Sequence, residues 1–186
     1  MASASIFPSA WEIPVDFTVR KGLSGLIKGD MTIHDAYDNL RFQVRSRLFN
    51  SSPWRVKTLL DASGNTLITC VNRQGGWEGF RGNSLDSKDA IFTAHKTVTS
   101  PFDAELKVFL MNGSLAQRRL AFRVKVAPFR GPAPFTRRIP SLHRLASPNF
   151  KLGKVIHSRH KFRLTVYPRI DHALVAAILV IFFGGH

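Results

Sequence analysis

Two segments of the sequence carry rows of cationic side chains at the two-residue spacing of a β-strand. Successive side chains of a strand point to opposite faces, so apolar residues such as Phe42 and Phe162 would face inward and the cations outward. The predicted outward cations are Arg41, Arg45 and Arg47 in the first segment, and Arg159, Lys161 and Arg163 in the second. Such rows suit phosphorylated headgroups, because each Lys or Arg near an anionic surface adds about 1 kcal/mol. The alternative is a set of solvated charges that protect strand edges.

Residues that could support catalysis or metal binding are scattered along the chain. His157 and His160 form an HxxH pair, but in a strand this spacing sends the two imidazoles to opposite faces, and no carboxylate lies nearby. Cys70 ends an apolar strand, which is typical of a small core residue. We therefore expect a protein that is not an enzyme and holds no metal or cofactor.

A glycine-rich segment surrounds Trp77 and Phe80 in the sequence GGWEGFRG. It has neither the GxGxxG pattern nor the GxxxxGK[ST] pattern of phosphate-binding loops. We predict a turn held by buried aromatic side chains.

The motif DAxxN occurs at 35–39 and again at 61–65. Asp can accept hydrogen bonds from backbone amides two residues further on, and Asn or Gly tolerates the left-handed conformation of a tight turn. The alternative, a calcium loop built from Asp35, Asp38 or Asp61, would need about six to eight oxygen ligands. The motif therefore favours two similar turns.

Short segments with alternating apolar and polar residues follow one another from residue 16 to residue 126. The predicted strands are Phe17–Arg20, Met31–His34, Leu40–Arg45, Arg55–Leu60, Thr66–Val71, Ala90–His95, Ala104–Leu110 and Leu120–Val126, with one or two more within Val155–Val166. Residues 127–150 contain five prolines and no acidic residue, and we expect an irregular loop there. The pattern predicts a mainly β protein.

The C-terminal segment contains eleven consecutive apolar residues, Ala173 to Phe183. They predict a helix that begins after Asp171 as N-cap, ends at Gly184 and must be buried on every side. Its length of about 16 Å is too short for a bilayer core of about 30 Å, although a membrane tail anchor is the alternative. The predicted core residues of this helix are Leu174, Val175, Ile178, Leu179, Ile181 and Phe182. An antiparallel sheet that closes around the helix would bury both apolar surfaces and leave no open strand edge.

The net charge of +15 is unevenly distributed. Residues 1–120 carry 15 Lys and Arg against 11 Asp and Glu, whereas residues 121–186 carry 12 against Asp171 alone. This excess of positive charge makes nucleic-acid binding through residues 118–169 an alternative. Such binding would be independent of sequence, because no recognition-helix or RNA-stacking motif is present. Its cations are Arg118, Arg119, Lys125, Arg130, Arg137, Arg138 and Arg144.

Several segments resemble the LURP-one-related proteins of plants: WEIPVDFTVRKGLSG, LLDASGNTLITCV, GGWEGFRGNSLDSKDAIFTAHK, ELKVFLMNG and FRLTVYPRIDHALVAAILVI. The resemblance implies a tubby-like antiparallel barrel of twelve strands around a central hydrophobic C-terminal helix. It also implies a regulatory module that is tethered to phosphoinositides or membranes in plant defence. Residues 127–150 depart from the family pattern, which leaves the completeness of the barrel open at that point.

The expected organisation is a flexible N-terminus at residues 1–10 and one domain at 11–183. With one cysteine and no basic, apolar leader, the chain is expected in a reducing cytoplasmic setting, at the plasma membrane or in the nucleus. Expected partners are anionic phospholipid headgroups, with the chain acting as a monomer without a transmembrane span. The alternative from kinship is a scramblase-like membrane lipid protein.

Overall fold

This computed structural model describes residues 13–22, 30–48, 55–73, 75–100, 103–112, 114–127, 144–147, 150–154 and 161–184, so the predicted flexible N-terminus lies outside the described residues. The described part consists of twelve strands, one short 3-10 helix and one α-helix. The elements are β1 (Val15–Lys21), β2 (Met31–His34), β3 (Leu40–Leu48), β4 (Arg55–Asp61), β5 (Thr66–Arg73), β6 (Gly76–Arg81), η1 (Ser87–Asp89), β7 (Ala90–Ser100), β8 (Asp103–Asn112), β9 (Ser114–Ala127), β10 (Arg144–Ser147), β11 (Phe150–Lys154), β12 (Lys161–Val166) and α1 (His172–Gly184).

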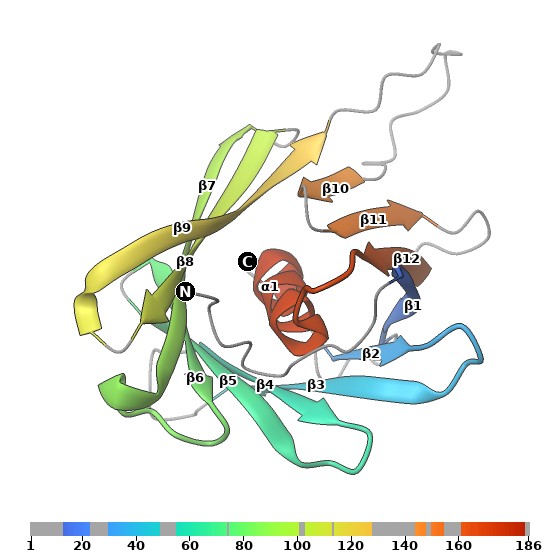
Figure 1. The fold of residues 1–186 in the computed structure, drawn as a ribbon, viewed down its shortest axis with the longest axis horizontal. Coiled ribbons are helices and arrows are strands. Elements are labelled where there is room, and N and C mark those ends of the chain that lie inside the picture. Colours follow the sequence, from blue (N-terminus) through green and yellow to red (C-terminus); the bar gives the residue numbers. More distant parts are fainter. Residues whose placement is uncertain are drawn as a thin grey trace.

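The strands form a closed antiparallel barrel in which each strand lies beside its neighbours in the sequence. Strands β1 and β12 complete the circuit, with Phe17 opposite Leu164 in the register. Figure 1 shows α1 inside the ring of strands. The strand pairing is shortest at β10, which pairs with β9 from Arg144 to Ala146 and with β11 only at Ala146 and Ser147.

The alternation of apolar and polar residues explains which side chains fill the barrel. In β1, Phe17 and Val19 are 4% and 0% exposed and belong to the core, while the other residues of the strand are only partly buried. The two-residue period therefore turns one face of the strand towards α1 and the other towards solvent.

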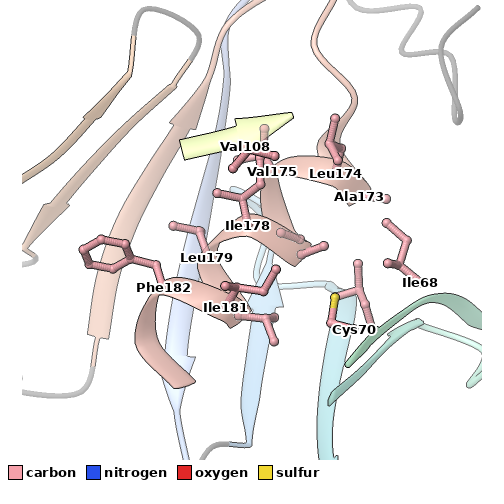
Figure 2. Close-up of a cluster of buried hydrophobic side chains, with 14 of the residues drawn as sticks. Ile68, Cys70, Val108, Ala173, Leu174, Val175, Ile178, Leu179, Ile181 and Phe182 are labelled. Carbon is pink, nitrogen blue, oxygen red and sulfur yellow. The ribbon is translucent and has the colours of Figure 1, made fainter. Parts of the chain in front are cut away.

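Helix α1 is the centre of the core, as predicted. The carboxylate of Asp171 accepts hydrogen bonds from the backbone amides of Ala173 and Leu174 at 2.9 and 3.1 Å, which caps the first turn. The predicted core residues are all buried and point into the surrounding strands (Figure 2): Leu174, Val175, Ile178, Leu179, Ile181 and Phe182. Among the described residues, no helix has the length and apolar character needed to cross a bilayer.

Three predictions about local structure need correction. The segment predicted as a glycine-rich turn is strand β6, although Trp77 and Phe80 are buried as expected. The region predicted to be irregular, 127–150, contains β10, because residues 144–147 form a short stretch between Pro140 and Pro148 that is free of proline. Strand β11 follows at Phe150–Lys154, so the barrel is not left incomplete at this point.

Candidate functional site

The two predicted rows of cations lie on one outer surface of the barrel. Strands β12, β1, β2 and β3 are consecutive neighbours, and Lys161 stands opposite Arg20, which stands opposite Thr32. At about 4.8 Å per strand, the three steps from β12 to β3 cover about 14 Å. We call this surface the basic face; its cations are Arg20, Arg41, Arg45, Lys161 and Arg163.

Carboxylates neutralise two members of the basic face. The guanidinium of Arg163 lies 3.3 Å from the carboxylate of Asp16, and Arg20 forms an ion pair with Asp38. The hydrogen bond from Arg20 holds the pKa of Asp38 below its ordinary value, so this carboxylate is charged at neutral pH.

Arg41, Arg45 and Lys161 form no ion pair with any carboxylate in the described parts of the chain. Arg41 and Arg45 are exposed, and Lys161 is partly exposed. Arg47 belongs to β3, but its side chain lies outside the described residues, as does the whole of Arg159. The basic face therefore retains three cations whose hydrogen-bonding groups are available to an anionic ligand.

The turn between β2 and β3 lies near these cations, through Asp35 and Asp38, and carries an exposed aromatic residue. Tyr37 is 87% exposed, and its backbone amide donates a 2.9 Å hydrogen bond to the carboxylate of Asp35. The same carboxylate accepts hydrogen bonds from the backbone and side-chain amides of Asn39 at 2.9 and 3.2 Å. This network holds the turn that carries Tyr37 in one conformation.

The second DAxxN motif forms the same kind of turn between β4 and β5. Asp61 accepts hydrogen bonds from the backbone and side-chain amides of Asn65, and Gly64 has a φ of +88°. The turn prediction is confirmed at both sites. Within the described residues, no group of three or more His, Cys, Asp or Glu side chains is placed to hold a metal ion.

The prediction for Cys70 is confirmed, because the residue is 1% exposed in the core beneath α1. Burial raises the pKa of its thiol to about 12, so the thiol is protonated at neutral pH. His157 and His160 lie outside the described residues. The side chains of all seven cations considered for nucleic-acid binding also lie outside the described part.

Sequence reasoning missed two residues of this surface. Arg20 follows the buried Val19 and is the outward member of the alternation in β1, so the strand pattern held the signal. Its place beside Lys161 depends on β1 and β12 being neighbours, which alternation alone does not reveal. Tyr37 gave no signal beyond its position in a turn motif.

The family model described as LURP-one-related matches residues 15–183 of the chain. Protein LURP-one-related 7 of Arabidopsis thaliana is 32% identical over 175 residues, which cover 93% of this chain and 91% of the relative. Protein LURP-one-related 15 of the same plant is 28% identical over 90% of this chain and 78% of the relative.

A solved structure of an Arabidopsis thaliana protein has a similar fold, with a TM-score of 0.57 and 26% sequence identity. The similarity covers 91% of this chain and 90% of that one, so it includes both the barrel and the enclosed helix. The family match extends over every described strand as well as α1, and its boundaries agree with those of the barrel. This chain therefore belongs to the LURP-one-related family and has the tubby-like fold that the family implies.

Proposed function

We propose that the protein is a non-enzymatic binding module whose basic face docks on phosphoinositide headgroups at the cytoplasmic surface of the plasma membrane. The observation that carries the proposal is the group of Arg41, Arg45 and Lys161, which share one outer surface and form no ion pair within 4.0 Å of a described carboxylate. Asp35 and Asp38 lie close enough for the charges of Arg41 and Lys161 to lower the pKa of their carboxyl groups, but neither cation is held in a direct ion pair. Membrane tethering of this kind would suit the role in defence signalling that the family resemblance implies.

The physical chemistry of these side chains favours a phosphate ligand. An Arg guanidinium can donate two parallel hydrogen bonds to one phosphate, and a Lys ammonium adds a point charge. Each cation near an anionic membrane surface contributes about 1 kcal/mol. Tyr37, exposed in the turn next to the basic face, has the apolar ring and polar tip that favour the membrane interface.

The edge-protection alternative has less support in a closed barrel. Cations protect an edge strand because its unpaired backbone groups would otherwise pair with another chain. Strands β3 and β12 are each paired on both sides, β3 with β2 and β4, and β12 with β1 and β11. Protection of a free edge therefore does not account for these rows of charge.

The non-enzymatic part of the proposal rests on the state of the single thiol. A cysteine nucleophile needs a thiolate that a substrate can reach. The Cys70 thiol is enclosed by the barrel, and its raised pKa of about 12 keeps it protonated. Cys70 therefore offers no nucleophile, which supports a binding module rather than a cysteine-dependent enzyme.

Vesicle co-sedimentation tests the proposal, using phosphatidylcholine vesicles with and without phosphatidylinositol bisphosphate. The variant Arg41→Gln, Arg45→Gln, Lys161→Gln loses three charges of about 1 kcal/mol each, so its binding to the phosphoinositide vesicles should be about a hundredfold weaker. Binding of the unmodified protein should also weaken with added salt.

The matched control is the variant Arg81→Gln, Lys88→Gln, Arg123→Gln, which removes three exposed cations from β6, η1 and β9. It should bind the phosphoinositide vesicles almost as well as the unmodified protein. An equal loss in both variants would show that only net charge matters, and no binding at low salt by the unmodified protein would refute the proposal.

A further inference from the structure

Three lysines face the interior of the barrel around the C-terminal end of α1. Lys21 lies two residues after Val19 in β1, Lys57 two residues before Leu59 in β4, and Lys96 two residues after Ala94 in β7. Those three apolar neighbours are at most 1% exposed, so the two-residue period directs all three lysines inward as well. The burial agrees, since Lys57 is only 5% exposed and the other two lysines are partly buried.

The contacts of two of these lysines bring them to the last residues of α1. The ammonium of Lys96 donates a 3.1 Å hydrogen bond to the backbone carbonyl of Phe182 and lies 4.9 Å from the centre of its ring. The ammonium of Lys21 lies 3.9 Å from the ring centre of Phe183 and 5.2 Å from that of Phe162. The interior of this end of the barrel is thus lined by cations and aromatic rings.

Stabilisation of the C-terminal end of α1 explains the positions of two of the three lysines. The last carbonyl groups of a helix carry partial negative charge, which favours cations, and aromatic faces attract ammonium groups. These effects account for Lys96 and for the ring contacts of Lys21. They leave Lys57 unexplained, because its ammonium contacts neither a carbonyl of α1 nor an aromatic ring among the described residues.

The charges at this end of the barrel are also unbalanced. None of the three lysines forms an ion pair with a carboxylate in the described residues. Burial lowers the pKa of Lys57, while the negative charge of Asp30 acts to raise it. Burial, together with the positive charge of Lys57, also lowers the pKa of Lys21. A buried, unpaired ammonium is costly, and a bound anion would remove that cost.

We propose that Lys21 and Lys57 bind a phosphate group of a small polyanion at the end of the barrel where α1 terminates. Ammonium groups bind phosphate as point charges, and an anion bound by both would replace their mutual repulsion with two attractions. The inference goes beyond the proposed function, because these side chains point into the barrel whereas those of the basic face point outward.

Thermal unfolding with inorganic pyrophosphate as the probe tests the inference, with chloride keeping the ionic strength constant. At ten times its Kd, pyrophosphate should raise the Tm of the full chain by about 3 to 6 °C. Lys57→Met and Lys21→Met should each lose most of this rise. The matched control Lys88→Met, which removes an exposed lysine of η1, should keep it.

The behaviour without pyrophosphate separates a ligand site from a structural role. Lys57→Met replaces a buried, unpaired charge with an apolar side chain of similar length, so it should unfold at a higher Tm than the unmodified protein in chloride alone. If Lys57 only supported the fold, the variant would unfold at a lower Tm and keep the full pyrophosphate effect. That result, or an equal pyrophosphate effect in all variants, would overturn the inference.

Two further arms identify the source of the phosphate and separate this site from the basic face. If Lys57→Met binds phosphoinositide vesicles normally, the source is a soluble anion; if its vesicle binding falls as well, the source is the lipid headgroup. The variant Arg41→Gln, Arg45→Gln, Lys161→Gln should keep the part of the pyrophosphate effect that Lys57→Met loses. Loss of the effect in that variant would place the anion outside the barrel and refute the inference, whereas failure of vesicle binding alone would refute only the basic-face proposal.

Discussion

Asp61 holds the turn between β4 and β5 through its two carboxylate oxygens. One oxygen accepts a 2.8 Å hydrogen bond from the backbone amide of Asn65, and the other accepts a 2.9 Å bond from the side-chain amide of the same residue. These bonds, the side-chain bond first, hold the pKa of Asp61 below its ordinary value of 3.8. A carboxylate that is stabilised in the folded state makes the stability of the protein depend on pH.

Substitution of Asp61 should therefore change both stability and its pH dependence. Asp61→Ala removes both hydrogen bonds, and we expect its Tm at pH 7 to be about 2 to 4 °C lower than that of the unmodified protein. Because the folded pKa is depressed, the contribution of Asp61 is present above pH 3.8 and is lost as the pH falls through the folded pKa.

Thermal unfolding of both proteins between pH 7 and pH 2 measures this effect, and the two Tm curves should converge at the acid end. Asp61→Asn, which keeps one acceptor oxygen, serves as the comparison, and at pH 7 its Tm should lie between those of Asp61→Ala and the unmodified protein. A constant Tm difference between Asp61→Ala and the unmodified protein across the whole range would contradict the role of the charge.

Single residues show what sequence patterns could and could not predict. Both DAxxN turns were predicted correctly, because an Asx turn is a local interaction with a local signal. The outward direction of Arg41 and Arg163 was also predictable from alternation. The inward lysines were not identified, because apolar patterning gives no reason to expect an ammonium such as that of Lys57 inside a barrel.

Strand β6 depends on a close approach between Gly79 and the ring of Phe92 on β7. The two residues are paired in the register, and Phe92 is 0% exposed. A Cβ atom at position 79 would lie 2.2 Å from the Cε1 atom of that ring, well inside van der Waals contact. The glycine therefore makes room for a large core side chain, a known use of glycine within strands.

Gly79→Ala should destabilise the protein by about 1 to 3 kcal/mol, because the added methyl group overpacks the core. Urea unfolding measures the change in the free energy of unfolding. Phe92→Leu in the same chain removes the atoms that clash, so the double variant should be more stable than the sum of the two single effects predicts. Strict additivity would show that the ring contact is not the reason for the glycine.

At the level of elements, sequence patterns located the alternating strands, including the four-residue β2, and missed β6, β10 and β11. Four glycines within residues 75–82 made β6 look like a turn, and only tertiary contacts such as that with Phe92 keep it extended. Strands β10 and β11 are short and lie among prolines, so their pattern is too brief to recognise. Their pairing with β9 and β12 completes the barrel.

The whole molecule is organised by the enclosure of α1. An apolar helix of 13 residues is too short to be stable alone in water, and the barrel would be hollow without it. Each therefore requires the other, which is why a helix without a polar face and a series of alternating strands together predicted the architecture. The two proposed binding sites lie on the surfaces that remain: the basic face outside and the lysines at the end of the barrel.

Amide hydrogen exchange of α1 tests this enclosure most directly, measured by NMR on the full chain without lipid or detergent. If the barrel surrounds the helix, the backbone amides of Ile178 to Phe182 open only when the whole molecule unfolds. Their free energy of exchange should then equal the free energy of unfolding from urea titration. Rapid exchange of these amides under native conditions, or protection that appears only when vesicles are added, would contradict the enclosure of α1 by the barrel.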